Sequence, residues 1–238
     1  MSNIYIGTSG FSYPHWRGNF YPQDLPQSEW FLYYTKYFDT VEINTTFYRQ
    51  IKKETFINWR KIAGDNFVFA LKGNRFITHI KKLKNCQKDV GRFFEAVEGD
   101  VILWQLPPGM RCDLKRLEEF LKILPQSFRQ AFEFRNQTWL NLGVYKLLRK
   151  YKVAVVFQDY PDWPMTEKVT ASFIYLRFHG RTGLYSSCYT KKELLVWAQK
   201  IKDWLKQGRD VYAYFNNDAL GYAIENAQTL KGLCLKKN

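Results

Sequence analysis

Eight short segments rich in β-branched and aromatic residues are spread along the chain. They span residues 4–8, 40–46, 67–72, 101–106, 131–135, 153–158, 173–178 and 211–215. Most of the stretches between them carry apolar residues at the three- and four-residue spacing of amphipathic helices. Strands that alternate with helices form β-α units around a parallel sheet. The pattern therefore predicts an α/β fold.

Helix start signals support several of the intervening helices. Ser28 precedes a predicted helix over residues 29–37, and Asp113 precedes another. Both residue types are preferred at the N-cap, where the side chain accepts a hydrogen bond from a free backbone N–H. Thr190 and Glu193 have the spacing of a capping box ahead of the seventh helix.

The sixth connection is the exception among the predicted helices. Residues 161–170 are few and contain proline, so we expect no full helix there. No linker, low-complexity tract or internal repeat divides the chain. Eight consecutive units predict one domain over residues 1–238, a parallel (β/α)8 TIM-type barrel with a short or irregular sixth helix. An open doubly wound sheet is the alternative, because periodicity does not reveal closure.

The second segment, TVEINTTFYR, has an unusual alternation of apolar and polar residues. Val41 and Ile43 fall on one face of the predicted strand, whereas Glu42 and Asn44 fall on the other. In a barrel the apolar face would contact the helices. The carboxylate and the amide would then face the barrel interior near its mouth.

Composition is that of a protein with a large core. Apolar residues make up 46% of the 238 residues and aromatic residues 18%. The four cysteines have no C-x-x-C spacing, which argues against a zinc knuckle or a disulfide framework. The N-terminal residues lack the basic and apolar regions of a leader, and no apolar run has the length of a membrane span. We therefore expect a cytoplasmic protein without a membrane partner.

The formal net charge of +14 has two explanations. It would favour an anionic partner, either a small molecule or nucleic acid, through long-range attraction. Solvated lysines on outer helix faces, such as Lys146, Lys150 and Lys200, would give the same excess without any partner. Charge alone leaves both open, and the sequence does not indicate an oligomeric state.

Polar residues stand at the carboxyl ends of nearly all predicted strands, where barrel enzymes carry their active sites. They are Thr8, Ser9, Glu42, Asn44, Lys72, Gln105, Glu133, Arg135, Asp159, Arg177, His179, Asn216, Asn217 and Asp218. Isolated polar residues there could bond loop backbone instead. The concentration indicates a shared site.

Three carboxylates and one histidine are the candidates for acid–base catalysis. They are Glu42, Glu133, Asp159 and His179. Lys72, Arg135 and Arg177, together with His179, could hold an anion, and Asn44, Gln105 and Asn216 could orient it. A structural charge network is the other interpretation of the same residues. Ser9 and Ser12 carry no local signature of an activated nucleophile.

Three further features could contribute to binding. His79 follows the third strand among basic residues and could be catalytic or bonded to the backbone. The loop HGRTG contains Arg181, and NND precedes the eighth helix, so these loops could receive a phosphate, although Asp218 could simply cap that helix. We expect no cofactor; a divalent ion held by Glu133, Asp159, His179 and Asp218 is the alternative.

The chain resembles the YecE-like family, catalogued as domain of unknown function 72. GTSGFSYPHW, TVEINTTFYR, FALKGNRFITH, LWQLPP, EFRNQTW, YLRFHGR and YFNND occur in the family's order over nearly the whole length. The resemblance implies a TIM barrel and adds Tyr48 and Trp139 to the residues in characteristic motifs. Phe11, Ile80 and Asn136 depart from the family pattern; Asn136 replaces a common histidine, which removes a possible proton carrier or metal ligand.

Three functions compete. The leading hypothesis is a hydrolase-like enzyme that uses acid–base chemistry on an anionic, phosphate-containing substrate, which includes nucleic acid. The second is a non-catalytic nucleic-acid-binding protein that uses outer lysines and exposed aromatic residues such as Tyr13, Trp16 and Tyr185. The third is a sugar-phosphate isomerase or lyase, for which the basic exterior has no role.

Overall fold

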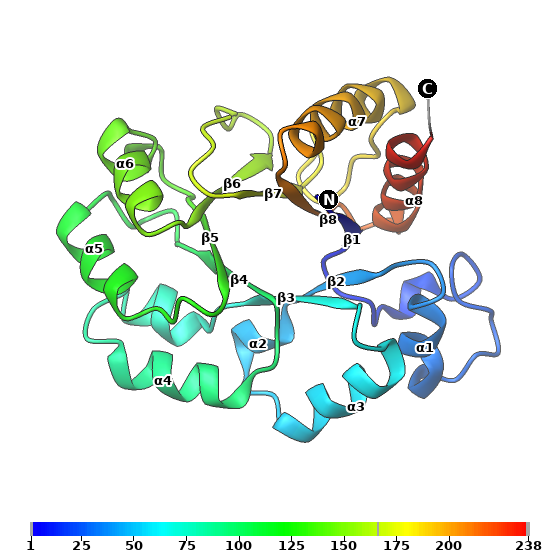
Figure 1. Ribbon diagram of the computed structural model, residues 1–238. Coiled ribbons are helices and arrows are strands. Elements are labelled where there is room, and N and C mark those ends of the chain that lie inside the picture. The colour runs from blue at the N-terminus through cyan, green and yellow to red at the C-terminus, as the bar shows by residue number, and fades with distance from the viewer. Residues whose placement is uncertain (1, 166, 237–238) are drawn as a thin grey trace.

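Eight parallel strands form the centre of the molecule in the computed structural model, which describes residues 2–165 and 167–236. Neighbours pair in sequence order from β2 to β8, and β8 pairs with β1. A parallel bridge between Ser9 and Glu42 joins the two remaining edges. The predicted (β/α)8 barrel is confirmed (Figure 1). The strands are β1 (Ile4–Thr8), β2 (Thr40–Ile43), β3 (Val68–Lys72), β4 (Val101–Gln105), β5 (Arg129–Glu133), β6 (Ala154–Asp159), β7 (Phe173–Phe178) and β8 (Asp210–Phe215).

Helices surround the strands (Figure 1). They are α1 (Trp30–Tyr34), α2 (Thr45–Tyr48), α3 (Lys53–Ala63), α4 (Gln87–Ala96), α5 (Leu114–Lys122), α6 (Leu142–Lys150), α7 (Lys191–Lys206) and α8 (Tyr222–Leu235). Between β6 and β7 the described residues form no helix, as predicted for the sixth connection. None of the helices in the described residues has the length and apolar character needed to cross a membrane.

Most of the predicted helix signals act as expected. The Asp113 side chain accepts a hydrogen bond of 3.0 Å from the backbone N–H of Arg116, and Thr190 and Glu193 form the complete capping box of α7. Gly64 ends α3 with a φ of 78°, a conformation that costs glycine little. The helix predicted over residues 29–37 is shorter in the structure, because α1 spans only Trp30–Tyr34 and follows a 3-10 turn. Ser28 lies within that turn and does not cap α1.

The second strand is also shorter than predicted. It ends at Ile43, and Thr45 begins the four-residue helix α2. The period-2 alternation therefore stops after Asn44, and the backbone turns directly above the end of β2. This turn brings Phe47 toward the end of β3, where the Lys72 ammonium lies over its ring.

Two layers of apolar side chains hold the barrel together. Val41 and Ile43 belong to the large outer layer between strands and helices, as predicted. A smaller inner layer includes Val101, Ala131 and Tyr175. Gly7 permits closure between β1 and β2, because a Cβ there would lie 2.4 Å from the carbonyl oxygen of Thr40. Above the inner layer the interior becomes charged.

Candidate functional site

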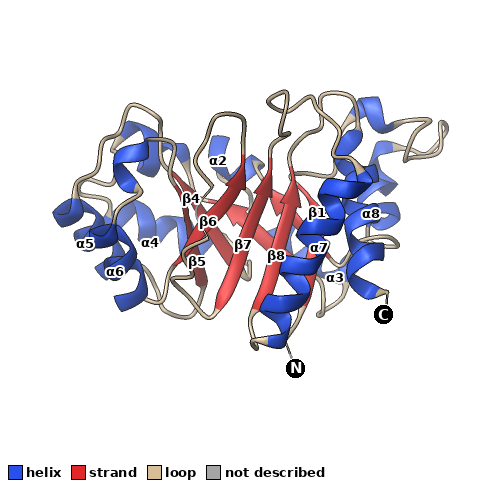
Figure 2. Ribbon diagram, turned by 90° about the horizontal axis from the view of Figure 1, so that it is seen from above, coloured by secondary structure: helices blue, strands red, loops and turns tan. Residues whose placement is uncertain are grey.

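The charged layer lies at the carboxyl ends of the strands. Side chains alternate between the two faces of a strand, so Glu42 on β2, Glu133 on β5 and Arg177 on β7 all point into the barrel. Each is at most 1% exposed. In Figure 2 the arrowheads of β6, β7 and β8 point toward this end, where α2 also lies. The structure therefore brings together three of the predicted site residues.

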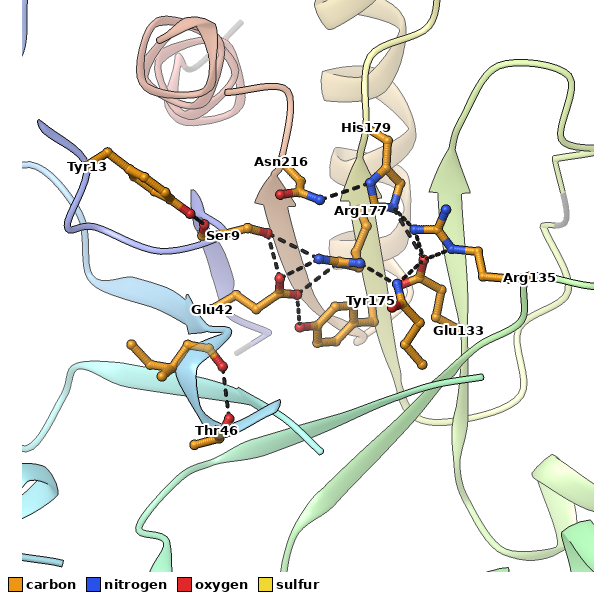
Figure 3. A network of polar contacts seen from close by, with 12 residues as sticks. Ser9, Tyr13, Glu42, Thr46, Glu133, Arg135, Tyr175, Arg177, His179 and Asn216 are labelled. Atoms are coloured by element: carbon orange, nitrogen blue, oxygen red, sulfur yellow. Dashed lines mark hydrogen bonds and ion pairs between the residues drawn. The ribbon is translucent and has the colours of Figure 1, made fainter. Parts of the chain in front are cut away.

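Arg177 joins the two carboxylates. Its Nε and Nη2 donate to the two carboxylate oxygens of Glu42 at 3.0 and 2.7 Å, and its Nη1 donates to Glu133 at 2.6 Å. Figure 3 shows the guanidinium between the two acids. Burial alone would lower the pKa of Arg177, but the charges of Glu133 and Glu42 outweigh it and raise the pKa above its usual value. Arg177 is thus a permanent cation with its charge compensated.

Glu42 is saturated with hydrogen bonds. Besides Arg177, the Ser9 hydroxyl donates to it at 2.5 Å and the Tyr175 hydroxyl at 2.7 Å. Burial favours the neutral acid, but the charge of Arg177 and these hydrogen bonds outweigh burial and lower the pKa of Glu42. The group is therefore a carboxylate at neutral pH.

Glu133 is held in the same state from the other side. Arg135 Nε donates to Glu133 at 2.5 Å, and Gln105 Nε2 donates at 3.1 Å. Burial again favours the acid, but the charges of Arg135 and Arg177 keep the pKa of Glu133 well below its usual value. Neither of these two glutamates is thus a proton donor at neutral pH.

We call the set Ser9, Glu42, Gln105, Glu133, Arg135, Tyr175 and Arg177 the mouth network.

His179 lies at the edge of the mouth network. Its Nε2 is 3.1 Å from Arg135 Nη2 and 3.4 Å from a Glu133 oxygen, and its Nδ1 is 3.2 Å from Asn216 Nδ2 (Figure 3). Burial and the two arginines lower the pKa of His179 to about 4, against the opposing influence of Glu133. The imidazole is therefore neutral at pH 7, and both of its nitrogens already have a neighbour within hydrogen-bond distance.

Lys72 occupies the end of β3 and differs from the arginines. Its ammonium lies 4.3 Å from the centroid of the Phe47 ring. Within the described residues, Nζ makes no hydrogen bond or ion pair. Burial, followed by the charge of Arg177, lowers the pKa of Lys72 to about 8. The Lys72 ammonium therefore loses its proton more readily than an unperturbed lysine does.

His79 also packs on the Phe47 ring, with ring centroids 5.0 Å apart and the two rings nearly perpendicular. The His79 Nδ1 is 2.8 Å from the Thr78 hydroxyl. Burial, then the charges of Lys72 and Arg75, lowers the pKa of His79 to about 4. We call Lys72, Phe47 and His79 the lysine corner.

Asn44 borders a hollow beside the mouth network. It lines a cavity of about 640 Å3 together with Tyr13, Arg49, Lys52 and other residues. The Asn44 Oδ1 is buried and has no hydrogen-bond partner among the described residues. Cavities of this size hold small molecules. Tyr48, which the family resemblance added to the candidate residues, does not line this cavity, and its side chain is 68% exposed.

Several predicted site residues lie elsewhere. Asp159 is on the outer face of β6, where its carboxyl bonds Trp197 and Tyr189; burial raises its pKa. Trp139 is fully buried and donates its indole N–H to the Met110 carbonyl at 2.7 Å. Both residues serve the packing of helices against strands rather than the barrel mouth.

The loops after β7 and β8 also use their polar groups internally. Asn217 is buried and donates to Ser187 and Asn226. Arg181 is exposed, 3.8 Å from Glu193. The polar groups of these loops therefore bond to each other and do not form the predicted phosphate-binding loop.

Asp218 does not cap the eighth helix, because Gly221 occupies that position. The Asp218 carboxylate instead accepts from the Trp16 indole at 2.9 Å and contacts His15 Nε2 at 2.9 Å. Trp16 is 1% exposed, so the expectation of an exposed aromatic residue there is wrong. Its ring packs on Tyr13, Phe20 and other aromatic side chains.

The four candidate metal ligands do not converge. Glu133 and His179 meet in the mouth network, but Asp159 faces α7 and Asp218 contacts Trp16. Among residues 2–165 and 167–236, no group of three or more histidine, cysteine or acidic side chains is arranged to hold a metal ion.

Sequence reasoning counted Ser9 among the polar residues at the strand ends but gave it no role, and it missed Tyr175. Ser9 has no nucleophile signature, yet its hydroxyl donates to Glu42. Tyr175 reads as an aromatic strand residue, yet its hydroxyl reaches the same carboxylate. The sequence signal was the two-residue period of a strand, which places residues i and i+2 on the same face. Tyr175 stands two positions before Arg177, and Ser9 stands two positions after Gly7.

Comparisons with known proteins agree with this architecture. The model of the family described as "Protein of unknown function DUF72" matches residues 5–237. The chain is 27% identical to the UPF0759 protein YecE of Escherichia coli K12 over 95% of this chain and 91% of that protein. It is 22% identical to the UPF0759 protein YunF of Bacillus subtilis, over 95% and 93% of the two chains.

Solved structures extend the comparison to the fold. A DUF72 family protein from Thermotoga maritima superposes with a TM-score of 0.88 and 27% identity, covering 98% of this chain and 100% of that one. A xylose isomerase-like TIM barrel protein from Mycobacterium smegmatis, with a TM-score of 0.56 and 14% identity over 97% of both chains, shares the barrel fold. The chain therefore belongs to the DUF72 family of TIM-barrel proteins.

Proposed function

We propose that this protein is an enzyme that binds an anionic, phosphate-containing small molecule at the barrel mouth and acts on it by acid–base chemistry. One observation carries the proposal: two cations at the mouth keep hydrogen-bond donors free beside carboxylates that are fully engaged. Lys72 Nζ has no hydrogen bond or ion pair among the described residues. Arg135 uses Nε and Nη2 on Glu133 and His179, which leaves Nη1 free among the same residues.

The charge balance of the mouth supports an anionic ligand. Glu42 and Glu133 contribute two negative charges, whereas Lys72, Arg135 and Arg177 contribute three positive charges when Lys72 is protonated. The surplus of one positive charge lies beside buried side chains, where a ligand charge is screened less than in bulk water. A phosphate group would accept hydrogen bonds from both free donors.

Acid–base work falls to the groups whose protonation state is not fixed by an ion pair. Glu42 and Glu133 remain ionised and are committed to the arginines, so we assign them to positioning. Lys72 has a pKa of about 8, close to the operating pH that favours general acid–base catalysis. His179 offers a neutral imidazole next to Arg135. We therefore assign Lys72 as the leading catalytic residue and His179 as the second.

The test combines binding and turnover. Calorimetry with inorganic phosphate should detect binding that weakens at least about tenfold in Lys72→Met, because one charge-assisted hydrogen bond is lost. Turnover should be sought over a panel of phosphorylated small molecules and short oligonucleotides, with Lys146→Met as the control for an exposed lysine. Absence of phosphate binding, or full turnover in Lys72→Met, would overturn the proposal. Oligonucleotide binding unaffected by Lys72→Met would favour a role of the outer surface instead.

A further inference from the structure

Lys72 has a fixed backbone. Its carbonyl oxygen accepts from the Thr46 hydroxyl at 2.7 Å, and the next residue, Gly73, donates to the Leu103 carbonyl at 2.8 Å. Gly73 lies against the Trp104 ring, where an added Cβ would be 2.3 Å from the nearest ring atom. The amine therefore projects from a rigid strand end into the barrel mouth, which is where a reactive group is held most accurately.

The surroundings of this amine favour reactivity over ion pairing. Both nearby carboxylates are engaged, Glu42 by Arg177 and Glu133 by Arg135 and Arg177. Nζ also lies 4.3 Å from the centroid of the Phe47 ring. A lysine that is desolvated and close to other cations keeps more of its amine neutral, and a neutral amine is a nucleophile toward carbonyl carbon.

We propose that Lys72 is a covalent catalyst that forms an imine with an aldehyde or ketone substrate. This inference rests on the proposed function and narrows its substrate to carbonyl compounds that carry a phosphate group. Inorganic phosphate would use both free donors, whereas in the covalent complex Lys72 bonds to the carbonyl carbon and the phosphate group is left to the free Arg135 Nη1.

The chemistry needs only the substrate and water. Nζ forms a bond to the carbonyl carbon as the C=O π electrons move to oxygen, which takes a proton, and nitrogen releases one. The resulting carbinolamine loses its hydroxyl group as water after a second protonation, and the nitrogen lone pair forms the C=N bond. The protonated imine then withdraws electrons from the adjacent carbon, so that a proton or a carbon–carbon bond there can be broken; addition of water reverses the linkage.

His79 is suited to carry protons between nitrogen and oxygen in these steps. It contacts the same Phe47 ring as Lys72. Its Nδ1 is engaged by Thr78, which leaves Nε2 without a hydrogen bond among the described residues. The imidazole is neutral at pH 7 and can accept the proton that nitrogen releases. We assign His79 as the proton carrier.

Reductive trapping tests the inference. The whole protein is incubated with glyceraldehyde 3-phosphate and sodium cyanoborohydride, and peptide mass spectrometry measures the rate of modification at each lysine. Lys72 should react at least about tenfold faster than exposed Lys146, since its larger neutral fraction raises its nucleophilicity. Inorganic phosphate should slow only the Lys72 reaction. His79→Asn should slow it as well, with the melting temperature showing that the variant is folded.

The outcomes separate the two proposals. Modification of Lys72 no faster than that of Lys146 would overturn the imine, while phosphate binding by calorimetry would still support the anion site. Equal rates with glyceraldehyde 3-phosphate and with glyceraldehyde, without phosphate binding, would support the imine and overturn the phosphate-containing substrate. A rate at Lys72 unchanged by His79→Asn would overturn the role of His79.

Discussion

Arg177 and Lys72 are two cations that face the same barrel mouth, yet their surroundings are opposite. Arg177 uses Nε, Nη1 and Nη2 on the carboxylates of Glu42 and Glu133. Lys72 has no carboxylate partner within the described residues and lies against an aromatic ring. The guanidinium cannot lose its proton in a protein, whereas a desolvated ammonium readily does. We infer that the number of engaged donors, rather than charge, distinguishes the structural cation from the reactive one.

The same contrast applies to the acid–base groups around them. The two glutamates are buried carboxylates with lowered pKa values, so their protonation does not change near pH 7. The lysine corner has one group with a pKa of about 8 and a neutral imidazole. Four substitutions test this difference, and they are ordered by the expected change in stability.

Arg177→Met should have the largest effect. It leaves Glu42 and Glu133 buried without their shared counter-ion, which destabilises proteins by roughly 3–5 kcal/mol. Urea denaturation at pH 7 should show this loss in the free energy of unfolding. A loss below about 1 kcal/mol would mean that Arg177 is not the structural centre of the mouth network.

Glu133→Gln should have the second largest effect. The amide keeps the shape but removes the charge that compensates Arg135 and Arg177, so we expect a loss of about 2–3 kcal/mol in the free energy of unfolding. The matched control is Glu98→Gln, because Glu98 forms an exposed pair with Lys53 at 3.8 Å, which should contribute less than about 0.5 kcal/mol. A large loss of turnover with unchanged stability would instead make Glu133 a catalytic residue.

His179→Gln should change how stability depends on pH. The pKa of His179 is about 4 in the folded state and about 6.5 in an unfolded chain. Between these values the unfolded chain binds more protons, so the stability of the wild type rises with pH over this window, by up to about 1.4 kcal/mol per pH unit from this group. The variant should show a shallower slope from pH 4.5 to 6.5 in urea denaturation. An identical slope would mean that His179 is not held neutral.

The fold was predictable because its signals are local and repeated. Period-2 segments separated by helical patterns predicted eight strands, and residues such as Asp113 and Thr190 predicted helix starts. Closure was favoured by the count of eight units, but the periodicity did not reveal it, since it depends on a bridge between Ser9 and Glu42, which are 33 positions apart in the chain. The early end of β2 was also missed, because alternation continues through Thr46 in the sequence while the backbone becomes helical.

The candidate site was predictable in location but not in the state of its groups. The same period placed Glu42, Glu133 and Arg177 together. It gave no information on which cation would take which carboxylate, because pairing depends on distances between strands that are far apart in sequence. Asp159 shows the limit most clearly: one position after Gln158, it faces the opposite side of β6 and leaves the mouth altogether.

Lys72→Met should have the smallest effect on stability and the clearest effect on function. Removal of a partly buried cation without a carboxylate partner should leave the free energy of unfolding at pH 7 unchanged or raise it by up to about 1 kcal/mol. Turnover and reductive trapping at this position should be lost.

The difference in stability between the wild type and Lys72→Met should depend on pH. The pKa of Lys72 is about 8 when folded, below the value of about 10.4 for an unfolded lysine. The unfolded chain therefore binds more protons between pH 8 and 10.4, and the wild type should gain stability relative to Lys72→Met as pH rises through this window. Urea denaturation of both proteins at pH 7, 8.5 and 10 measures the difference. If the wild type instead loses stability relative to the variant, Lys72 holds its proton through a partner, and the contrast between a committed arginine and a free lysine is wrong.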